Sequence, residues 1–157
     1  MRALLCIGLL LALVGSAAAS DAPVFRRANG SAIVFPGAVC TWCGAERLNV
    51  FSLARRIRQS RWQLQIARKS VHSGRVVRFS WRRENGIRIF VYDSKTRNEA
   101  SDGAEGSHGK ITLRRATCRR GQAVEIGLSG TIASEFFDGK PVRMSGTYRG
   151  RIGSRPG

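Results

Sequence analysis

Two cysteines separated by two residues have the spacing in this chain that is most typical of catalysis. Cys40 and Cys43 enclose Thr41 and Trp42, directly before a segment, 45–59, that we expect to form an amphipathic helix. A thiolate at the start of a helix is stabilised by unpaired backbone amides and the helix dipole, which lowers its pKa. This arrangement favours thiol–disulfide redox chemistry.

The same four residues resemble the active-site stretch of thioredoxin-type oxidoreductases, and this resemblance implies a redox enzyme. It is confined to these residues, because the flanking Pro-Cys pattern is absent and the rest of the chain predicts hairpins instead of parallel strands with crossover helices. We therefore keep a thiol–disulfide redox protein that uses Cys40 and Cys43 as the alternative function.

A third cysteine favours a structural role. A disulfide from Cys118 to Cys40 or Cys43 would close a loop of roughly 75 residues and stabilise an exported domain by about 3 to 5 kcal/mol. The remaining thiol would then be buried or used for dimerisation, and a Cys40–Cys43 pair with a free Cys118 stays open. All three cysteines are disulfide candidates.

Other signatures of catalysis and metal binding are missing from the sequence. His72 lies at an expected turn and His108 in an expected loop, and the two are not at a spacing typical of metal ligands. Gly44 stands where a c-type haem site requires histidine, and no nucleophile elbow, zinc-protease motif or phosphate-binding loop is present. We expect a non-enzymatic protein with no catalytic residues, no cofactor and no metal.

The first residues predict export. Arg2 precedes an apolar run at 3–14 and a small-residue segment at 15–19, which is the pattern of a signal peptide cleaved near Ala19/Ser20. We expect residues 1–19 to be removed, 20–157 to form a single antiparallel β-rich domain, and the product to be periplasmic or secreted. No later segment approaches the roughly 20 apolar residues of a transmembrane helix.

A strong positive charge points to an anionic partner. The chain has 27 Lys and Arg against 10 Asp and Glu, and loss of Arg2 leaves a net charge of +16. Most of these cations are arginines, which bind phosphate and carboxylate through two hydrogen bonds. We expect an acidic protein, lipopolysaccharide or phospholipid head groups as partner. The alternative is that the charge reflects composition and serves solubility.

Alternation of apolar and polar residues predicts most of the secondary structure. We expect a short strand at 32–35, the helix at 45–59 with a strand at 48–53 as its alternative, and an exposed loop at 93–110. A hairpin with its turn at Asn85–Gly86 is expected between two alternating runs. The expected strands are centred on Trp62, Leu64 and Ile66, on Val77, Phe79 and Trp81, on Ile87, Ile89 and Val91, on 110–118, on Val124, Ile126 and Leu128, and on 142–152.

These elements predict a mainly β (α+β) fold. It is an antiparallel meander sheet, sandwich or small barrel of about six or seven strands, with one N-terminal helix packed on it. One sheet face is expected to be apolar and the other cationic. The candidate residues for binding an anionic partner are Arg78, Arg82, Arg83, Arg114, Arg115, Arg143, Arg149 and Arg151.

The aromatic residues bear on the choice of partner. We expect Trp62, Phe79, Trp81 and Tyr148 on the apolar side, whereas recognition of single-stranded nucleic acid uses exposed rings for stacking. Specific nucleic-acid binding is therefore disfavoured. The sequence predicts an exported, non-enzymatic binding or accessory protein that engages an anionic envelope component or acidic protein, a class that includes immunity and inhibitor proteins.

Overall fold

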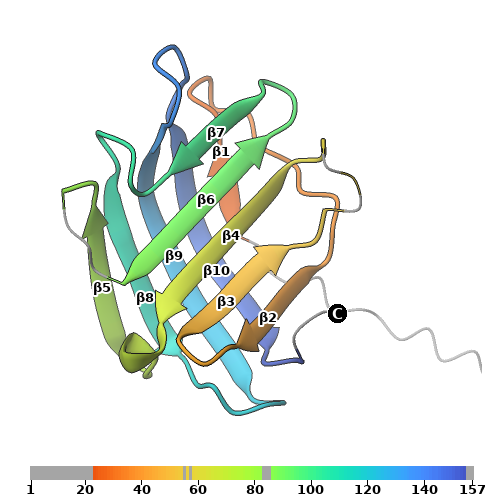
Figure 1. Cartoon of the computed structure of the whole chain (residues 1–157), viewed down its shortest axis with the longest axis vertical. Helices are drawn as coiled ribbons and strands as arrows, with labels where there is room; N and C mark the ends of the chain where they lie inside the picture. The colour runs from red at the N-terminus through yellow and green to blue at the C-terminus, as the bar shows by residue number, and fades with distance from the viewer. Residues whose placement is uncertain (1–22, 55, 57, 83–85, 155–157) are drawn as a thin grey trace, which may run out of the picture.

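The protein folds almost entirely into β-strands. The structure is a computed structural model that describes residues 23–54, 56, 58–82 and 86–154 (Figure 1). Within these residues the elements are β1 Val24–Arg26, β2 Val39–Cys43, β3 Arg47–Ser52, β4 Arg61–Ala67, the 3-10 helix η1 Arg68–Ser70, β5 Arg75–Ser80, β6 Ile87–Asp93, β7 Asn98–Ser101, β8 His108–Arg115, β9 Ala123–Ser134 and β10 Val142–Arg151. All of the pairings between these strands are antiparallel.

The strands form a sheet that curls into a half-barrel, and β9 divides it into two parts. We call the part with the order β1-β10-β9-β8-β5 sheet A and the part with the order β2-β3-β4-β6-β7 sheet B. The first part of β9 pairs with β8 and β10, whereas Ala133 and Ser134 at its end pair with β7. Sheet B is in front and sheet A behind in Figure 1.

Inward-facing side chains from both sheets form a common core. Phe25 of β1 and Trp62 of β4 are fully buried, and their ring centroids are 5.4 Å apart. Tyr148 of β10 also packs on Trp62 and shares a hydrogen bond with Thr41 of β2. Burial raises the pKa of Tyr148, and this hydrogen bond offsets only part of that effect. The contact joins β10 of sheet A to the outermost strand of sheet B.

The expected helix at 45–59 is wrong. Its residues form β3 and the connection that follows it, and the described part of the chain contains no α-helix. The alternative strand at 48–53 agrees with β3 to within one residue at each end. An inward position of this strand is occupied by Ser52, whose hydroxyl accepts a 2.9 Å hydrogen bond from the amide of Trp62. A polar residue at a core position breaks the alternation of apolar and polar residues that indicates a strand. The remaining apolar residues then have a spacing that resembles that of a helix.

The expected hairpin through Asn85–Gly86 is also wrong. Among the described strands β5 pairs with β8, and β6 pairs with β4 and β7. Asn85 lies outside the described residues, and Gly86 has a φ of +74°. A turn signal reports a local reversal of the chain, whereas burial of a strand's apolar face sets its partner. Trp81, which was expected on the apolar side, lies beyond β5 and is 38% exposed.

Two further expectations are corrected at the ends of elements. The segment 32–35 contains only an isolated bridge from Ala32 to Arg26, and the strand in this region is β1, which comes before the expected one. The expected loop at 93–110 contains β7 and the start of β8. β7 is polar and buries only Ala100, so it has no apolar alternation to reveal it.

Strands with strict alternation are confirmed. In β4 every second residue is buried, and in β10 the apolar residues are buried while Arg143, Arg149 and Arg151 are exposed. The mainly β, antiparallel fold is confirmed as well. The described residues form ten strands instead of six or seven, because β1, β2 and β7 were not predicted and β3 was predicted as part of a helix.

Candidate functional site

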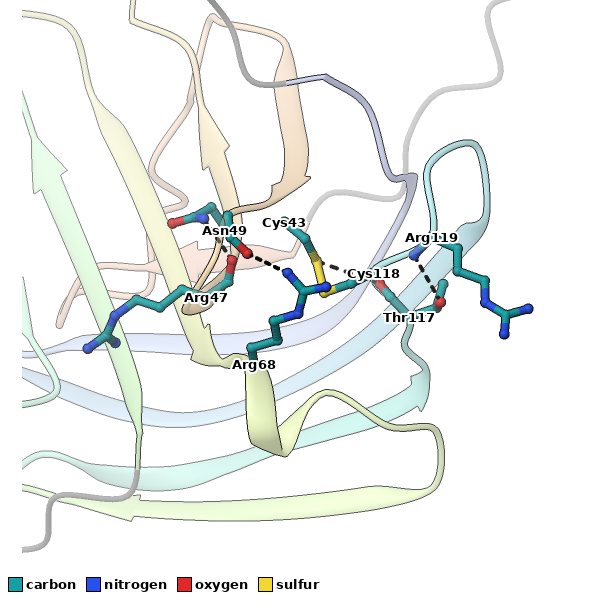
Figure 2. Close-up of a disulfide and its surroundings, with 8 residues drawn as sticks. Cys43, Arg47, Asn49, Arg68, Thr117, Cys118 and Arg119 are labelled. Carbon is teal, nitrogen blue, oxygen red and sulfur yellow. Dashed lines mark hydrogen bonds between the residues drawn. A yellow bond between two sulfur atoms is a disulfide. The ribbon is translucent and has the colours of Figure 1, made fainter.

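The cysteines connect the two sheets. Cys43 at the end of β2 is bonded to Cys118 in the connection between β8 and β9, and their Cα atoms are 5.4 Å apart (Figure 2). The expected disulfide from Cys118 to Cys40 or Cys43 is thus confirmed, and its partner is Cys43. Cys40 is a half-buried free thiol. Residues three apart on a strand point to opposite faces, so Cys40 and Cys43 of β2 are not side by side at the start of a helix.

Hydrogen bonds hold the backbone on both sides of this disulfide. The amide of Arg119 donates to Oγ1 of Thr117 at 3.1 Å, and Nη1 of Arg68 donates to the carbonyl of Gly44 at 2.9 Å. Figure 2 shows these contacts around the two sulfur atoms. The disulfide is therefore part of the ordered framework that fixes β2 against the connection between β8 and β9.

Metal-ligating side chains do not gather within the described part of the chain. No group of three or more His, Cys, Asp or Glu is close enough there to hold a metal ion. His72 contacts Nη1 of Arg75 at 3.1 Å, and His108 contacts the carbonyl of Gly106 at 2.9 Å. The two histidines therefore have separate local partners.

The outer face of sheet A concentrates positive charge. The five strands of sheet A contain nine Lys and Arg and a single acidic residue, Glu125. Alternation places seven of these cations on the outer side, and the register shift after Leu113 brings Arg115 opposite Glu125 on the same side, whereas Arg75 shares the inward register of Val77. We call the eight the cationic face, and they are Arg26, Arg78, Lys110, Arg114, Arg115, Arg143, Arg149 and Arg151.

Two pairs of like charges lie directly opposite each other on this face. Arg26 of β1 is the cross-strand partner of Arg143, and Arg78 of β5 is the partner of Lys110. Like charges directly opposite each other on one face of a sheet are destabilising. One pair is near each edge of sheet A, so like charges are cross-strand neighbours on both sides of the face.

Small hydroxyl side chains lie between the two charged edges. In the middle strands Ser129 is the cross-strand partner of both Ser145 and Lys110, and Thr131 is the partner of Arg143. A hollow of about 540 Å³ opens beside them, lined by Arg78, Ser80, His108, Lys110, Ser129 and their neighbours. Hydroxyl groups and cations thus line the same hollow.

The single carboxylate of sheet A neutralises only one end of the cationic face. Glu125 accepts contacts from Nη1 of Arg114 at 3.3 Å and from Nη2 of Arg149 at 3.5 Å. Both arginine side chains remain more than half exposed. Exposed ion pairs of this kind contribute little to stability, so they leave both guanidinium groups accessible to a partner.

The structure brings most of the candidate arginines together. Arg82 lies beyond β5, with its guanidinium 4.7 Å from the centroid of the Trp81 ring, and Arg83 lies outside the described residues. The other six candidates belong to the cationic face. Sequence reasoning missed Arg26 and Lys110, although each alternates with a buried apolar neighbour in a strand.

The outer face of sheet B has a different character. Trp42 and Phe51 pack edge to face with ring centroids 4.5 Å apart, and the guanidinium of Arg61 is 4.7 Å from the ring centroid of Tyr92. These half-buried rings were missed, because Trp42 lies in a strand that was not predicted and Phe51 in one that was predicted as a helix. Trp62, Phe79 and Tyr148 are buried as expected. The two outer faces of the molecule are therefore one cationic and one aromatic.

Comparison of the chain with protein-family models, with curated proteins and with solved structures gives no significant match. No helix within the described residues has the length and apolar character needed to cross a membrane.

Proposed function

We propose that this protein is a non-enzymatic, exported binding protein whose cationic face attaches to a surface of repeated phosphate groups, namely the phospholipid or lipopolysaccharide head groups of a cell envelope. The observation that carries this proposal is the pair of like-charge contacts, Arg26 with Arg143 and Arg78 with Lys110. An anionic partner that neutralises these charges removes the repulsion within each pair, and this relief favours binding.

The distribution of the charges favours an extended partner. The cationic face covers the five strands of sheet A, which at a strand spacing of about 4.8 Å is about 19 Å from β1 to β5. One small anion cannot reach both like-charge pairs. A surface with several phosphate groups can neutralise both pairs, and the hydroxyls of Ser129 and Ser145 between them can donate hydrogen bonds to phosphate oxygens.

The Cys43–Cys118 disulfide is compatible with this role, because disulfides persist outside the reducing cytosol. The alternative of a redox protein gains no support from the geometry. Cys43 is already bonded to Cys118, and Cys40 points to the opposite face of β2.

Removing one cation from each like-charge pair tests the proposal. The double variant Arg143→Gln, Lys110→Gln should bind vesicles of phosphatidylcholine and phosphatidylglycerol about 30-fold more weakly than the unmodified protein, since a basic residue at an anionic surface contributes about 1 kcal/mol. Its melting temperature should be equal or higher, because both like-charge contacts are relieved. Vesicle co-sedimentation and thermal unfolding measure the two effects.

The matched control is Arg56→Gln, Arg58→Gln, which removes the same charge from two exposed residues outside sheet A. This control should lose much less affinity. Equal losses for the two double variants would show that net charge alone drives binding and would overturn the proposal. Binding to polyglutamate but not to the vesicles would replace the envelope surface by an acidic protein.

A further inference from the structure

Three loops surround a cleft at one end of the molecule, next to the Arg26 and Arg143 end of the cationic face. The cleft has a volume of about 630 Å³ and is lined from segments 27–29, 93–98 and 136–142. These loops lie together at the upper end of Figure 1. We call it the loop-end cleft. Its size is typical of pockets that bind small molecules.

A buried carboxylate fixes two of the three loops. Asp93 accepts hydrogen bonds from Nε and Nη2 of Arg27 at 2.6 and 2.8 Å, from the amide of Lys95 at 3.2 Å and from Oγ1 of Thr96 at 2.8 Å. Its side chain is 2% exposed. Both oxygens of Asp93 are therefore used within the framework, and the wall of the cleft is built before any ligand arrives.

Arg97 in this wall has an unusual backbone conformation. Its φ is +53°, and it is the only non-glycine residue with a positive φ among those described. The left-handed region is unfavourable for a residue with a long side chain, and such strain tends to be retained at functional positions. The Arg97 side chain lines the cleft and has no hydrogen bond or ion pair to any described residue. A residue of the lining therefore carries an exposed guanidinium that has no described partner.

Lys140 supplies a second cation to the lining, and a separate network fixes its backbone. Nδ2 of Asn98 donates to the carbonyl of Lys140 at 2.7 Å, while Oδ1 of Asn98 accepts from Oγ of Ser134 at 2.5 Å. A Cβ atom at Gly139 would overlap Oγ of Ser134, so only glycine fits this close approach. The ammonium group of Lys140 has no partner among the described residues.

Apolar side chains supply the rest of the lining. Phe136 and Pro141 contribute from the connection between β9 and β10, and Phe136 is 50% exposed, whereas Val142 at the start of β10 is buried. The lining contains three cationic and two acidic residues and so has a net charge of +1. Because Arg27 is already paired with Asp93, Arg97 and Lys140 are the cations that remain for a ligand.

We propose that the loop-end cleft binds a small molecule with one anionic group on an apolar body. The anion lies between Arg97 and Lys140, and the apolar body packs against Phe136 and Pro141. This site is independent of the binding proposed for the cationic face, which requires many anionic groups instead of one.

Titration with a matched series of eight-carbon probes tests this proposal on the purified protein. Octanoate and octyl phosphate carry the anion, whereas octanol and octylamine have the same tail without it. Octanoate should shift the backbone amide NMR signals of residues 93–98 and 136–142. Octanol and octylamine should bind at least tenfold more weakly. Comparison of octanoate with octyl phosphate then distinguishes a carboxylate ligand from a phosphate ligand.

Variants identify the groups that recognise the anion. Arg97→Gln, Lys140→Gln should lose at least tenfold in affinity for octanoate, whereas Arg119→Gln, Arg120→Gln, which alters two exposed residues of the turn between β8 and β9, should not. Equal binding of octanol and octanoate, or the absence of shifts at saturating octanoate, would overturn the proposal. Neither result would bear on the vesicle experiment.

Replacement of Arg97 by glycine separates stability from binding. Glycine accepts the positive φ without strain, so Arg97→Gly should raise the melting temperature by about 3 °C while it weakens octanoate binding. A variant that gains stability and keeps full affinity would show that Arg97 does not contact the ligand.

Discussion

Replacing Cys43 and Cys118 together by alanine should lower the free energy of unfolding by about 4 kcal/mol. The disulfide closes a loop of 75 residues, and in the chain-entropy model a loop of that length destabilises the unfolded state by about this amount. The loss should be largest at β2, because Cys43 ties this outermost strand of sheet B to the connection between β8 and β9. Urea unfolding measures the free energy, and hydrogen exchange measures the local opening of β2.

Cys40→Ala is the control for the disulfide. Cys40 is half-buried and unbonded, so its loss should cost less than about 1 kcal/mol, within the range of ordinary substitutions. The assignment of the disulfide as the main stabilising crosslink would be contradicted if the single variant were as unstable as the double variant.

Asp93→Asn should destabilise the protein by about 3 kcal/mol at neutral pH. The substitution leaves the guanidinium of Arg27, whose side chain is only 15% exposed, without its charged partner, and breaking a buried ion pair is costly for this reason. Burial acts to raise the pKa of Asp93, but the hydrogen bonds from Arg27, Thr96 and the amide of Lys95 outweigh it, and the net pKa is lowered.

The sign of this shift predicts a pH dependence. Because the pKa of Asp93 is lower in the folded than in the unfolded state, its contribution is fully present above the unfolded value of about 4 and is lost as the pH falls below it. The stability difference between the unmodified protein and Asp93→Asn should therefore shrink in acid. Chemical unfolding at a series of pH values measures it, and a difference that stayed constant down to the acid limit would contradict this role of the charge.

Asp102 provides a control with the opposite sign. Burial raises the pKa of Asp102 despite its 2.6 Å hydrogen bond from the amide of Ile89. Its contribution is therefore lost as the pH rises through the folded value. Asp102→Asn keeps an oxygen that can accept this hydrogen bond, so it should leave stability at neutral pH unchanged or higher. A large loss at neutral pH would show that the charge of Asp102 is required.

The sequence predicted the fold well where side chains alternate strictly. β4 and β10 bury apolar residues at every second position, and their two faces follow directly from that pattern. β3 was obscured by Ser52 at an inward position, and β7 by its polar composition. Strand partners such as β5 with β8 depend on which apolar faces are buried together, and local turn signals do not carry that information.

The candidate site was predicted in part for the same reason. Alternation placed Arg143, Arg149 and Arg151 on one face, but their neighbour Arg26 comes from β1, which was not predicted as a strand. The loop-end cleft was out of reach of sequence reasoning. It forms where three connections from distant parts of the chain meet, and its most telling feature, the positive φ of Arg97, is a backbone property.

β5 leaves an open edge on sheet A, since its only described partner is β8. A strand from another molecule can pair with such an edge. Val76, which is 50% exposed, adds apolar surface that favours this association. Arg75 and Arg78 on the same strand oppose this pairing, because two copies joined edge to edge would bring four guanidinium groups close together. A polyanion that neutralises these arginines removes the repulsion between two β5 edges. Excess polyanion should therefore lower the solubility of the protein, because it neutralises the charges that keep copies of the chain apart.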